Sequence, residues 1–166
     1  MPKQSAGLLV YRRTGGELEL LLAHPGGPLF AGKDVGSWTV PKGEHGADEE
    51  PLAAAVREFA EELGQPPPKG ERLDLGEVRQ ASGKLVRCFA VEGDLDMSEV
   101  LSNEFEMEWP PRSGRFGRFP EVDRAEWFPA DVARAKLNRS QAAFVDRLEE
   151  LLARGEVGSG GPPAQR

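Results

Sequence analysis

Residues 43–64, GEHGADEEPLAAAVREFAEELG, constrain the fold more than any other stretch, because they join a loop to a strongly patterned helix. The segment turns helical after Pro51, and at about 100° per residue its apolar side chains fall on one stripe. We expect a helix from about Asp48 to Leu63. Its predicted core face consists of Leu52, Val56, Phe59 and Leu63.

A second side of this predicted helix is acidic. Glu58, Glu61 and Glu62 lie within five consecutive positions, and Arg57 precedes the first of them. Like charges four residues apart destabilise a helix by about 0.2–0.5 kcal/mol, and a cation bound between them would reverse the sign of that cost. Mg²⁺ suits best, because it prefers oxygen ligands and often bridges carboxylates to substrate phosphates. The alternative is a solvated acidic face that binds no ion.

The charged positions follow the spacing G-x5-E-x7-R-E-Φ-x-E-E-x-G, where x is any residue and Φ is apolar. The matching residues are Gly43, Glu49, Arg57, Glu58, Phe59, Glu61, Glu62 and Gly64. In this pattern the chain resembles the Nudix hydrolase family. Gln65 departs from it, because the family usually has an aliphatic residue there, but that position packs rather than reacts.

The resemblance implies an α/β fold, a Nudix-type α/β/α sandwich with a mixed central sheet, in which the motif forms a loop–helix–loop. We expect this domain to span residues 3–154 and a disordered tail to span residues 155–166. The implied activity is hydrolysis, dependent on Mg²⁺ or Mn²⁺, of a phosphoanhydride bond in a nucleoside diphosphate linked to another group. The substrate would be a nucleoside triphosphate or a dinucleoside polyphosphate.

The resemblance also implies roles for individual residues. The metal ligands would be Glu58, Glu61, Glu62 and the backbone carbonyl of Lys42. Arg57 and Glu49 would form a charge pair that fixes the rotamers of these glutamates. Metal ions would neutralise the diphosphate and lower the pKa of a bound water, and a glutamate of the motif or of a loop would accept its proton.

Three glutamates in residues 94–126, a region predicted to be irregular, are candidates for that loop residue. Glu104, Glu106 and Glu108 alternate with apolar residues, so their carboxylates would share one side of an extended segment. One of them could reach the metal site. The alternative is the polar side of an edge strand.

Arginines follow these glutamates at three-residue spacing, at Arg112, Arg115 and Arg118. Because arginine can bind phosphate oxygens with two parallel hydrogen bonds, we predict that Arg112 and Arg115 hold the substrate phosphates. Salt bridges to the acidic neighbours are the alternative.

Two further patterns bear on the substrate. The lead-in SWTVPKG contains Trp38 and also Lys42, which could bind a phosphate. It resembles Nudix members that act on dinucleoside polyphosphates and on diphosphoinositol polyphosphates. Dinucleoside polyphosphate hydrolases often carry a tyrosine shortly after the motif, whereas this chain has QASGK at residues 80–84. A diphosphoinositol polyphosphate hydrolase and a non-catalytic Nudix-like ligand-binding domain therefore stay open as alternatives.

The composition excludes several other classes of protein. A net charge of −7 argues against a nucleic-acid polymer or a membrane surface as partner. We expect a small phosphorylated substrate, with a nucleotide as the first candidate. The single cysteine, Cys88, fits a reducing compartment, and no apolar run has the length of a membrane span, so we expect a cytoplasmic protein. His24 and His45 lack metal-ligand spacing, and both are predicted to be solvated.

The rest of the chain mixes strands and helices. Residues 6–24 are predicted to form a hairpin, and residues 72–80 and 84–93 two strands joined around Ser82 and Gly83. A last strand is expected at residues 125–130, then a helix that begins near Pro129, and then a long helix that Gly155 ends. The long helix has an apolar stripe that is either core or the contact face of a homodimer. The stripe consists of Phe144, Leu148, Leu151 and Leu152.

Overall fold

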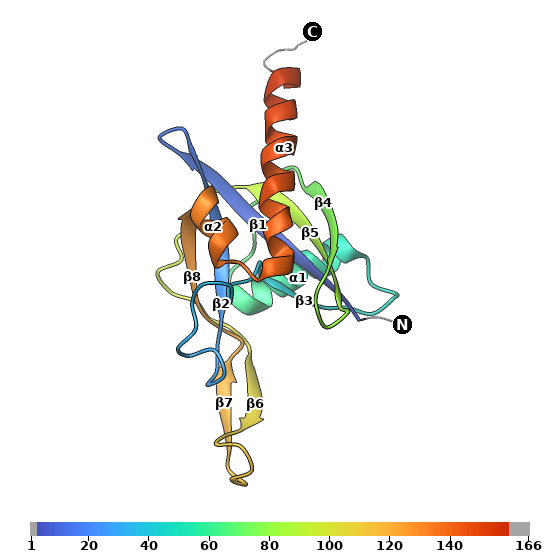
Figure 1. The fold of residues 1–166 in the computed structure, drawn as a ribbon. Helices are drawn as coiled ribbons and strands as arrows, with labels where there is room; N and C mark the ends of the chain where they lie inside the picture. The colour runs from blue at the N-terminus through green and yellow to red at the C-terminus, as the bar shows by residue number, and fades with distance from the viewer. Residues whose placement is uncertain (1–2, 160–166) are drawn as a thin grey trace.

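The computed structural model describes residues 3–159, with side chains as far as residue 155 (Figure 1). The strands are β1 (Gln4–Thr14), β2 (Glu17–Pro25), β3 (Lys42–Glu44), β4 (Leu73–Arg79), β5 (Leu85–Glu92), β6 (Glu104–Glu108), β7 (Phe116–Pro120) and β8 (Val122–Pro129). The helices are α1 (Pro51–Leu63), α2 (Ala130–Lys136), the short 3₁₀ helix η1 (Arg139–Gln141) and α3 (Ala142–Ser159).

A six-stranded mixed sheet forms the centre of the molecule, in the order β4-β5-β1-β2-β8, with β3 paired to β1. β1 runs parallel to β5, whereas its pairings with β2 and β3 are antiparallel. The predicted β1–β2 hairpin and the predicted β4–β5 pair are both confirmed. Because β3 pairs with one end of β1, the motif loop lies against the sheet.

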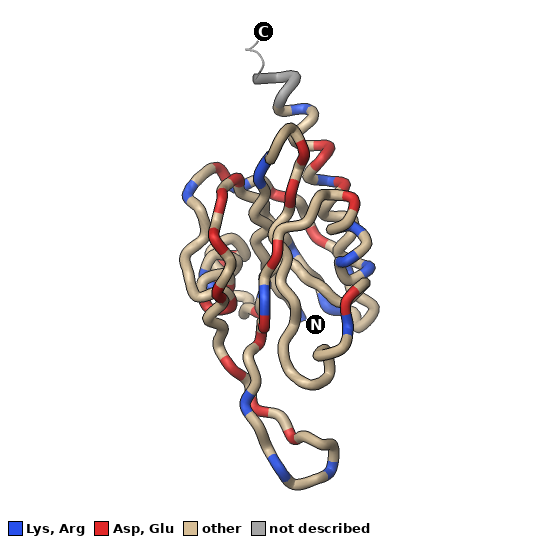
Figure 2. Tube along the Cα trace, turned by 90° about the vertical axis from the view of Figure 1, so that its left-hand side faces the viewer, with Lys and Arg blue, Asp and Glu red and all other residues tan. Residues whose placement is uncertain are grey.

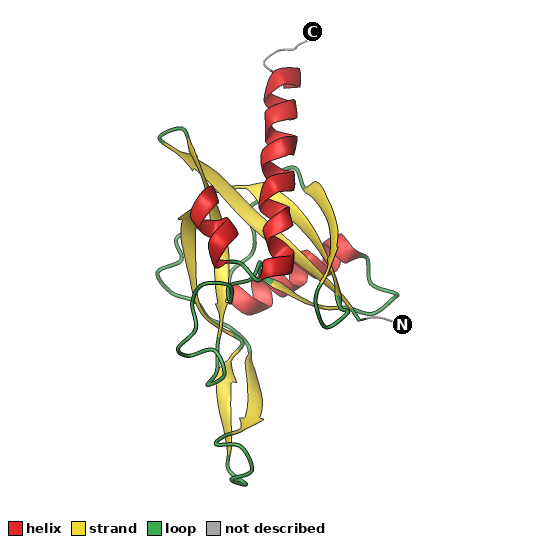
Figure 3. Cartoon of the chain, in the orientation of Figure 1, coloured by secondary structure: helices red, strands yellow, loops and turns green. Residues whose placement is uncertain are grey.

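Helices cover both faces of this sheet (Figure 3). Side chains alternate along a strand, so Leu8 and Leu9 of β1, both fully buried, belong to two different cores. Leu8 packs in the core that includes Phe59 of α1, and Leu9 in the core that includes Phe144 and Leu148 of α3. The α/β/α sandwich predicted from the motif is confirmed, and the α3 stripe contributes to the chain's own core.

The helix α1 differs in detail from its prediction. It begins at Pro51, because Glu50 is still extended, with φ −64° and ψ 135°. Val56 is only half-buried, so its assignment to the core face was wrong, and two alanines lie fully buried instead. The buried residues of α1 are Ala54, Ala55, Phe59, Glu62 and Leu63. Small side chains at the contact let the helix lie close to the sheet.

The prediction that residues 94–126 are irregular was wrong for much of the segment. β6 and β7 pair as an antiparallel two-stranded sheet, with Phe105 opposite Phe119, and β8 begins at Val122. The two-residue alternation of apolar and acidic side chains in β6 suits such a ribbon. Figures 1 and 2, two views turned by 90°, show this β6–β7 hairpin standing away from the rest of the molecule.

The C-terminal helix also departs from expectation, because α3 continues through Gly155 to Ser159. The first residues of the predicted tail are therefore helical, and residues 160–166 lie outside the described part of the chain. Domain limits at residues 3 and 154 stay a prediction. Within residues 3–159, none of the helices has both the length and the apolar character needed to cross a membrane.

Candidate active site

The motif loop passes directly beside the Glu58 carboxylate at Gly43, so a larger residue there would displace that carboxylate. A Cβ atom on Gly43 would lie 1.9 Å from the carboxyl carbon of Glu58. At the other end of α1, Gly64 adopts φ 80°, a left-handed conformation that suits glycine, and its amide donates to the carbonyl of Ala60. The two outer glycines of the motif thus fix the approach to the helix and its end.

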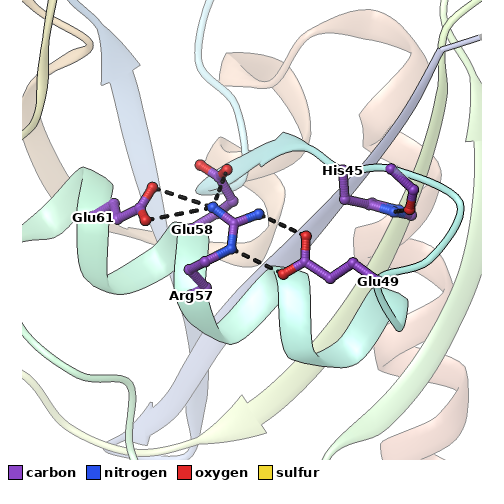
Figure 4. A network of polar contacts seen from close by, with 6 residues as sticks. His45, Glu49, Arg57, Glu58 and Glu61 are labelled. Carbon is purple, nitrogen blue, oxygen red and sulfur yellow. Dashed lines mark hydrogen bonds and ion pairs between the residues drawn. The ribbon is translucent and has the colours of Figure 1, made fainter.

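Arg57 connects three of the motif carboxylates (Figure 4). Its Nε and Nη2 each donate to a carboxylate oxygen of Glu49 at 2.9 Å, so the predicted pair is present and bidentate. Its Nη1 lies 2.9 Å from Glu58 Oε2 and 3.3 Å from Glu61 Oε1. The hydrogen bonds from Arg57 lower the pKa of the Glu49 carboxyl, which keeps this partner charged.

Glu62 differs from the other motif glutamates in being buried, with 8% of its surface exposed. Its Oε1 accepts a hydrogen bond from the backbone amide of Lys42 at 3.1 Å, which ties α1 to β3. Burial raises the pKa of Glu62 to about 8, against the opposing effect of the Lys42 ammonium. Burial, and then the neighbouring charge of Lys84, lower the pKa of Lys42.

A cavity of about 390 Å³ brings Glu58, Glu61 and Glu62 together with two further carboxylates, Glu44 and Glu121. Its lining residues are Ser5, Lys42, Gly43, Glu44, Glu58, Glu61, Glu62, Lys84, Asn103 and Glu121. We call this space the carboxylate cavity. Burial, and then the charges of Glu58 and Glu61, raise the pKa of the Glu121 carboxyl.

Glu121 was missed in the sequence because it stands alone between Pro120 and Val122 and has no spacing relation to the motif. Its backbone amide donates to the carbonyl of Asn103 at 2.8 Å, and the amide of Asn103 donates to the carbonyl of Glu61 at 3.1 Å. The segment at Asn103 therefore connects Glu121 to the end of α1. Pro120, which ends β7, was the one local sign of a turn at this point.

The donor set of the carboxylate cavity fits a hard divalent cation, because its lining includes five glutamates that can supply oxygen ligands. Within residues 3–159, no three His, Cys, Asp or Glu side chains are already arranged to hold an ion. Instead, Arg57 Nη1 forms ion pairs with Glu58 at 2.9 Å and with Glu61 at 3.3 Å. An ion bound by these two glutamates would compete with the guanidinium for their oxygens.

A second, larger cavity of about 630 Å³ shares Lys42, Glu62 and Glu121 with the carboxylate cavity. We call it the acceptor cavity. It extends along the loop between β2 and β3 to Phe105 of the hairpin and to Asn138 before η1. Gln141, which also lines it, is fixed by a hydrogen bond from the backbone amide of Val40 to its Oε1 at 2.9 Å. The acceptor cavity thus has both aromatic and polar walls.

The arginines predicted to hold phosphate do not reach either cavity. Arg112 and Arg115 lie in the turn between β6 and β7, and neither lines the carboxylate cavity or the acceptor cavity. Strand pairing carries this turn away from α1, so in this structure the predicted clamp does not line the site, and phosphate binding by Arg112 and Arg115 stays a prediction. Arg118 forms the alternative interaction, an ion pair of 3.2 Å with Glu104.

The predicted loop glutamates are also displaced from the site. Glu104, Glu106 and Glu108 lie on β6, and none of them lines the carboxylate cavity, whereas Glu121 does. Glu104 binds Arg118, and Glu108 Oε2 accepts a hydrogen bond from the amide of Gly114 at 2.8 Å. These contacts and positions fit the alternative explanation, in which the three glutamates belong to the polar side of a strand.

His24 and Cys88, two side chains of types that often act in catalysis, are both buried in the core. His24, predicted to be solvated, is fully buried, with Nδ1 2.9 Å from Asp123 Oδ1 and Nε2 2.8 Å from the carbonyl oxygen of Lys33. That prediction was wrong because β2 places the ring against Trp38. Complete burial raises the pKa of the Cys88 thiol, so Cys88 is a core residue and unsuited to act as a nucleophile.

Comparison with known proteins places this geometry in a family. The family model described as NUDIX domain matches residues 1–148. No match was found among curated proteins. Among solved structures, the NUDIX domain of Shewanella oneidensis NrtR, crystallised with ADP ribose, is 17% identical, with a TM-score of 0.63 over 92% of this chain and 89% of that chain.

Two hydrolases have the same fold. A C. elegans Ap4A hydrolase, in a binary complex, is 21% identical, with a TM-score of 0.59 over 92% of this chain and 98% of its own. The Nudix hydrolase RenU from M. smegmatis is 24% identical, with a TM-score of 0.60 over 91% of this chain and 86% of its own. The structural matches establish the fold, and the family model spans most of the chain. The chain therefore belongs to the NUDIX domain family and is a pyrophosphohydrolase of the Nudix type.

Proposed function

We propose that the protein hydrolyses a phosphoanhydride bond in a nucleoside diphosphate linked to another group, with Mg²⁺ or Mn²⁺ as cofactor. The observation that carries this proposal is the junction of the two cavities at Lys42, Glu62 and Glu121. A diphosphate at this junction would lie beside the carboxylates while the rest of the substrate occupied the acceptor cavity.

The motif residues have distinct parts in this proposal. Glu58, Glu61, Glu62 and the backbone carbonyl of Lys42 would hold the metal, and Glu49 would keep Arg57 in place beside them. The bound metal would supply charge neutralisation and a more acidic water. The ion pairs with Arg57 would limit the rotamers of Glu58 and Glu61, so these two ligands would be partly ordered before the metal binds.

Glu121 is our candidate for the proton acceptor. It comes from the junction of β7 and β8, so it reaches the carboxylate cavity from a different element than the α1 glutamates. A water between Glu121 and the substrate phosphate would lose its proton to the Glu121 carboxylate as the water oxygen attacks phosphorus. The bond to the leaving oxygen breaks in the same displacement.

The lining of the acceptor cavity favours a nucleoside over a heavily phosphorylated inositol. Its charged residues, among those described, are Lys33, Asp34, Lys42, Glu62 and Glu121. Two lysines against three carboxylates suit a ligand with little charge of its own, whereas a diphosphoinositol polyphosphate carries many phosphates. Phe30 and Phe105 offer faces against which a base could stack, and Gln80 lines the cavity in the region where the resemblance leads one to look for tyrosine.

The test is an assay with Mg²⁺ or Mn²⁺ over nucleoside triphosphates, dinucleoside polyphosphates, nucleotide sugars and diphosphoinositols, with products identified by mass. We expect turnover of a nucleoside substrate and its loss, by at least about a hundredfold, in Glu62→Gln. Equal turnover by the wild type and Glu62→Gln would contradict the proposal. Turnover confined to diphosphoinositols would transfer the activity to the alternative substrate class.

A further inference from the structure

The carboxylate cavity has a second wall of opposite character. Strand pairing places Ser5 of β1 directly opposite Glu44 of β3, and Ser5 also pairs with Val86 of β5, close to Lys84. Ser5, Lys42, Glu44 and Lys84 all line the cavity. This wall therefore includes two lysines and a serine, whereas the other side of the cavity holds the motif glutamates.

Lys84 is a fixed cation on this wall. Its Nζ lies 3.0 Å from Glu44 Oε2, and a quarter of its side chain is exposed. The backbone of its turn is closed by hydrogen bonds from the Gln80 amide to the Lys84 carbonyl and from the Gly83 amide to the Gln80 carbonyl, both 2.8 Å. Gln80 lines the acceptor cavity, so one tight turn contributes a side chain to each cavity.

Ser5 supplies an independent observation on the same wall. Its side chain is buried, with 1% of the residue exposed, and its hydroxyl has no hydrogen-bond partner among the described residues. A buried hydroxyl without a partner is unfavourable, and such groups call for an acceptor or donor that the isolated chain does not provide. A phosphate oxygen held by Lys84 would offer that acceptor.

We propose that Lys84 and Ser5 form a binding subsite for a phosphate next to the one attacked, and that Lys84 exchanges Glu44 for phosphate oxygens when substrate binds. The subsite rests on the proposed function for its place in catalysis, but the binding it predicts is measurable without turnover. Its effect would be to select substrates whose phosphate chain extends past the scissile bond toward Lys84. Glu44 neutralises the ammonium while no phosphate is bound.

The chain offers a matched control lysine for this proposal. Lys3 lies 4.0 Å from the other carboxylate oxygen of Glu44, but it is mostly exposed and does not line the carboxylate cavity. Lys3→Met and Lys84→Met remove the same charge from the same carboxylate. Only Lys84→Met removes it from the cavity.

The experiment measures the affinity for inorganic pyrophosphate by calorimetry with Mg²⁺ present, after thermal melting has shown that each variant folds. Because hydrogen bonds to charged groups are among the stronger ones, we expect Lys84→Met to weaken binding at least about tenfold. Ser5→Ala should weaken it by about threefold, and Lys3→Met by less than about twofold. Glu44→Gln should strengthen it by about two- to fivefold, because it frees the ammonium.

A double variant separates the exchange from a general effect of charge. If Lys84 is the group that Glu44 releases, Glu44→Gln strengthens binding much less in the Lys84→Met background than in the wild type. Pyrophosphate affinity that is the same in Lys84→Met, Lys3→Met and the wild type would overturn the subsite, even if the enzyme turns over nucleotides. Weakened binding in Lys84→Met alone would support it, even if no nucleotide in the panel is hydrolysed.

Discussion

The loop–helix around α1 and the β6–β7 hairpin are both rich in glutamate and arginine, yet they use these residues differently. In the first, Arg57 contacts three carboxylates, and Glu58 is only 12% exposed. In the second, Arg118 and Glu104 form a pair that is mostly exposed, and no interaction of the Arg112 and Arg115 guanidiniums is seen within the described residues. The two regions have similar composition but very different surroundings.

The difference shows what turns charged residues into a site. The glutamates of α1 face a cavity because Gly43 lets β3 approach Glu58, and because strands from other parts of the chain close the remaining sides. The strands of the hairpin pair only with each other, and the charged side chains of Glu104, Glu106 and Arg118 are exposed, so water screens their charges. Convergence of separate elements, rather than local charge density, distinguishes the candidate active site.

The two regions differ in function only if no glutamate of the hairpin contributes to catalysis as much as Glu121 does. We expect Glu121→Gln to lower kcat by about 10²–10⁴-fold, the usual contribution of a positioned proton acceptor. Glu106→Gln makes the same chemical change on β6 and should leave kcat within about twofold of the wild type. Steady-state kinetics on the best substrate of the panel would measure both. If kcat fell by similar factors in the two variants, Glu106 of the hairpin would again be a candidate for the proton acceptor.

The sequence predicted the α1 side of this comparison better than the hairpin side, for a physical reason. Arg57 and Glu58 lie on α1, and Glu49 lies in the loop just before it, so one short loop–helix segment brings the three together. Glu121 joins them through the path of β7 and β8, and the burial of His24 depends on the Trp38 and Asp123 that tertiary packing supplies. Contacts between distant strands leave no local pattern, so neither residue could be placed from its neighbours in sequence.

Stability against pH would sharpen the contrast between buried and exposed glutamates. Burial raises the pKa of Glu62 from 4.5 in its ordinary state to about 8, so the folded chain keeps a proton that the unfolded chain loses. The contribution of Glu62 to the free energy of unfolding is fully present below about pH 4.5 and is lost as the pH rises through about 8. In the absence of metal, the melting temperature of Glu62→Gln should therefore exceed that of the wild type by roughly 5–10 °C at pH 8. Near pH 4 the two melting temperatures should be equal.

The control again comes from the hairpin. Glu106 is exposed, so Glu106→Gln should follow the melting curve of the wild type at every pH. Differential scanning calorimetry in the presence of a chelator measures all three proteins. A melting difference between Glu62→Gln and the wild type that does not change with pH would mean that folding does not raise the pKa of Glu62.

The smallest effect is expected at the tip of the hairpin. Because Arg112 and Arg115 line neither cavity, the double variant Arg112→Ala/Arg115→Ala should keep kcat and KM within about twofold of the wild type. A phosphate clamp would instead raise KM by about tenfold or more, since each arginine would lose charge-assisted hydrogen bonds. Arg57→Ala, which removes the same group from the α1 network, is the positive control and should lower kcat. A raised KM in the tip variant would mean that the hairpin folds back over the active site during catalysis. The hairpin would then be separate from the active site only in the free enzyme.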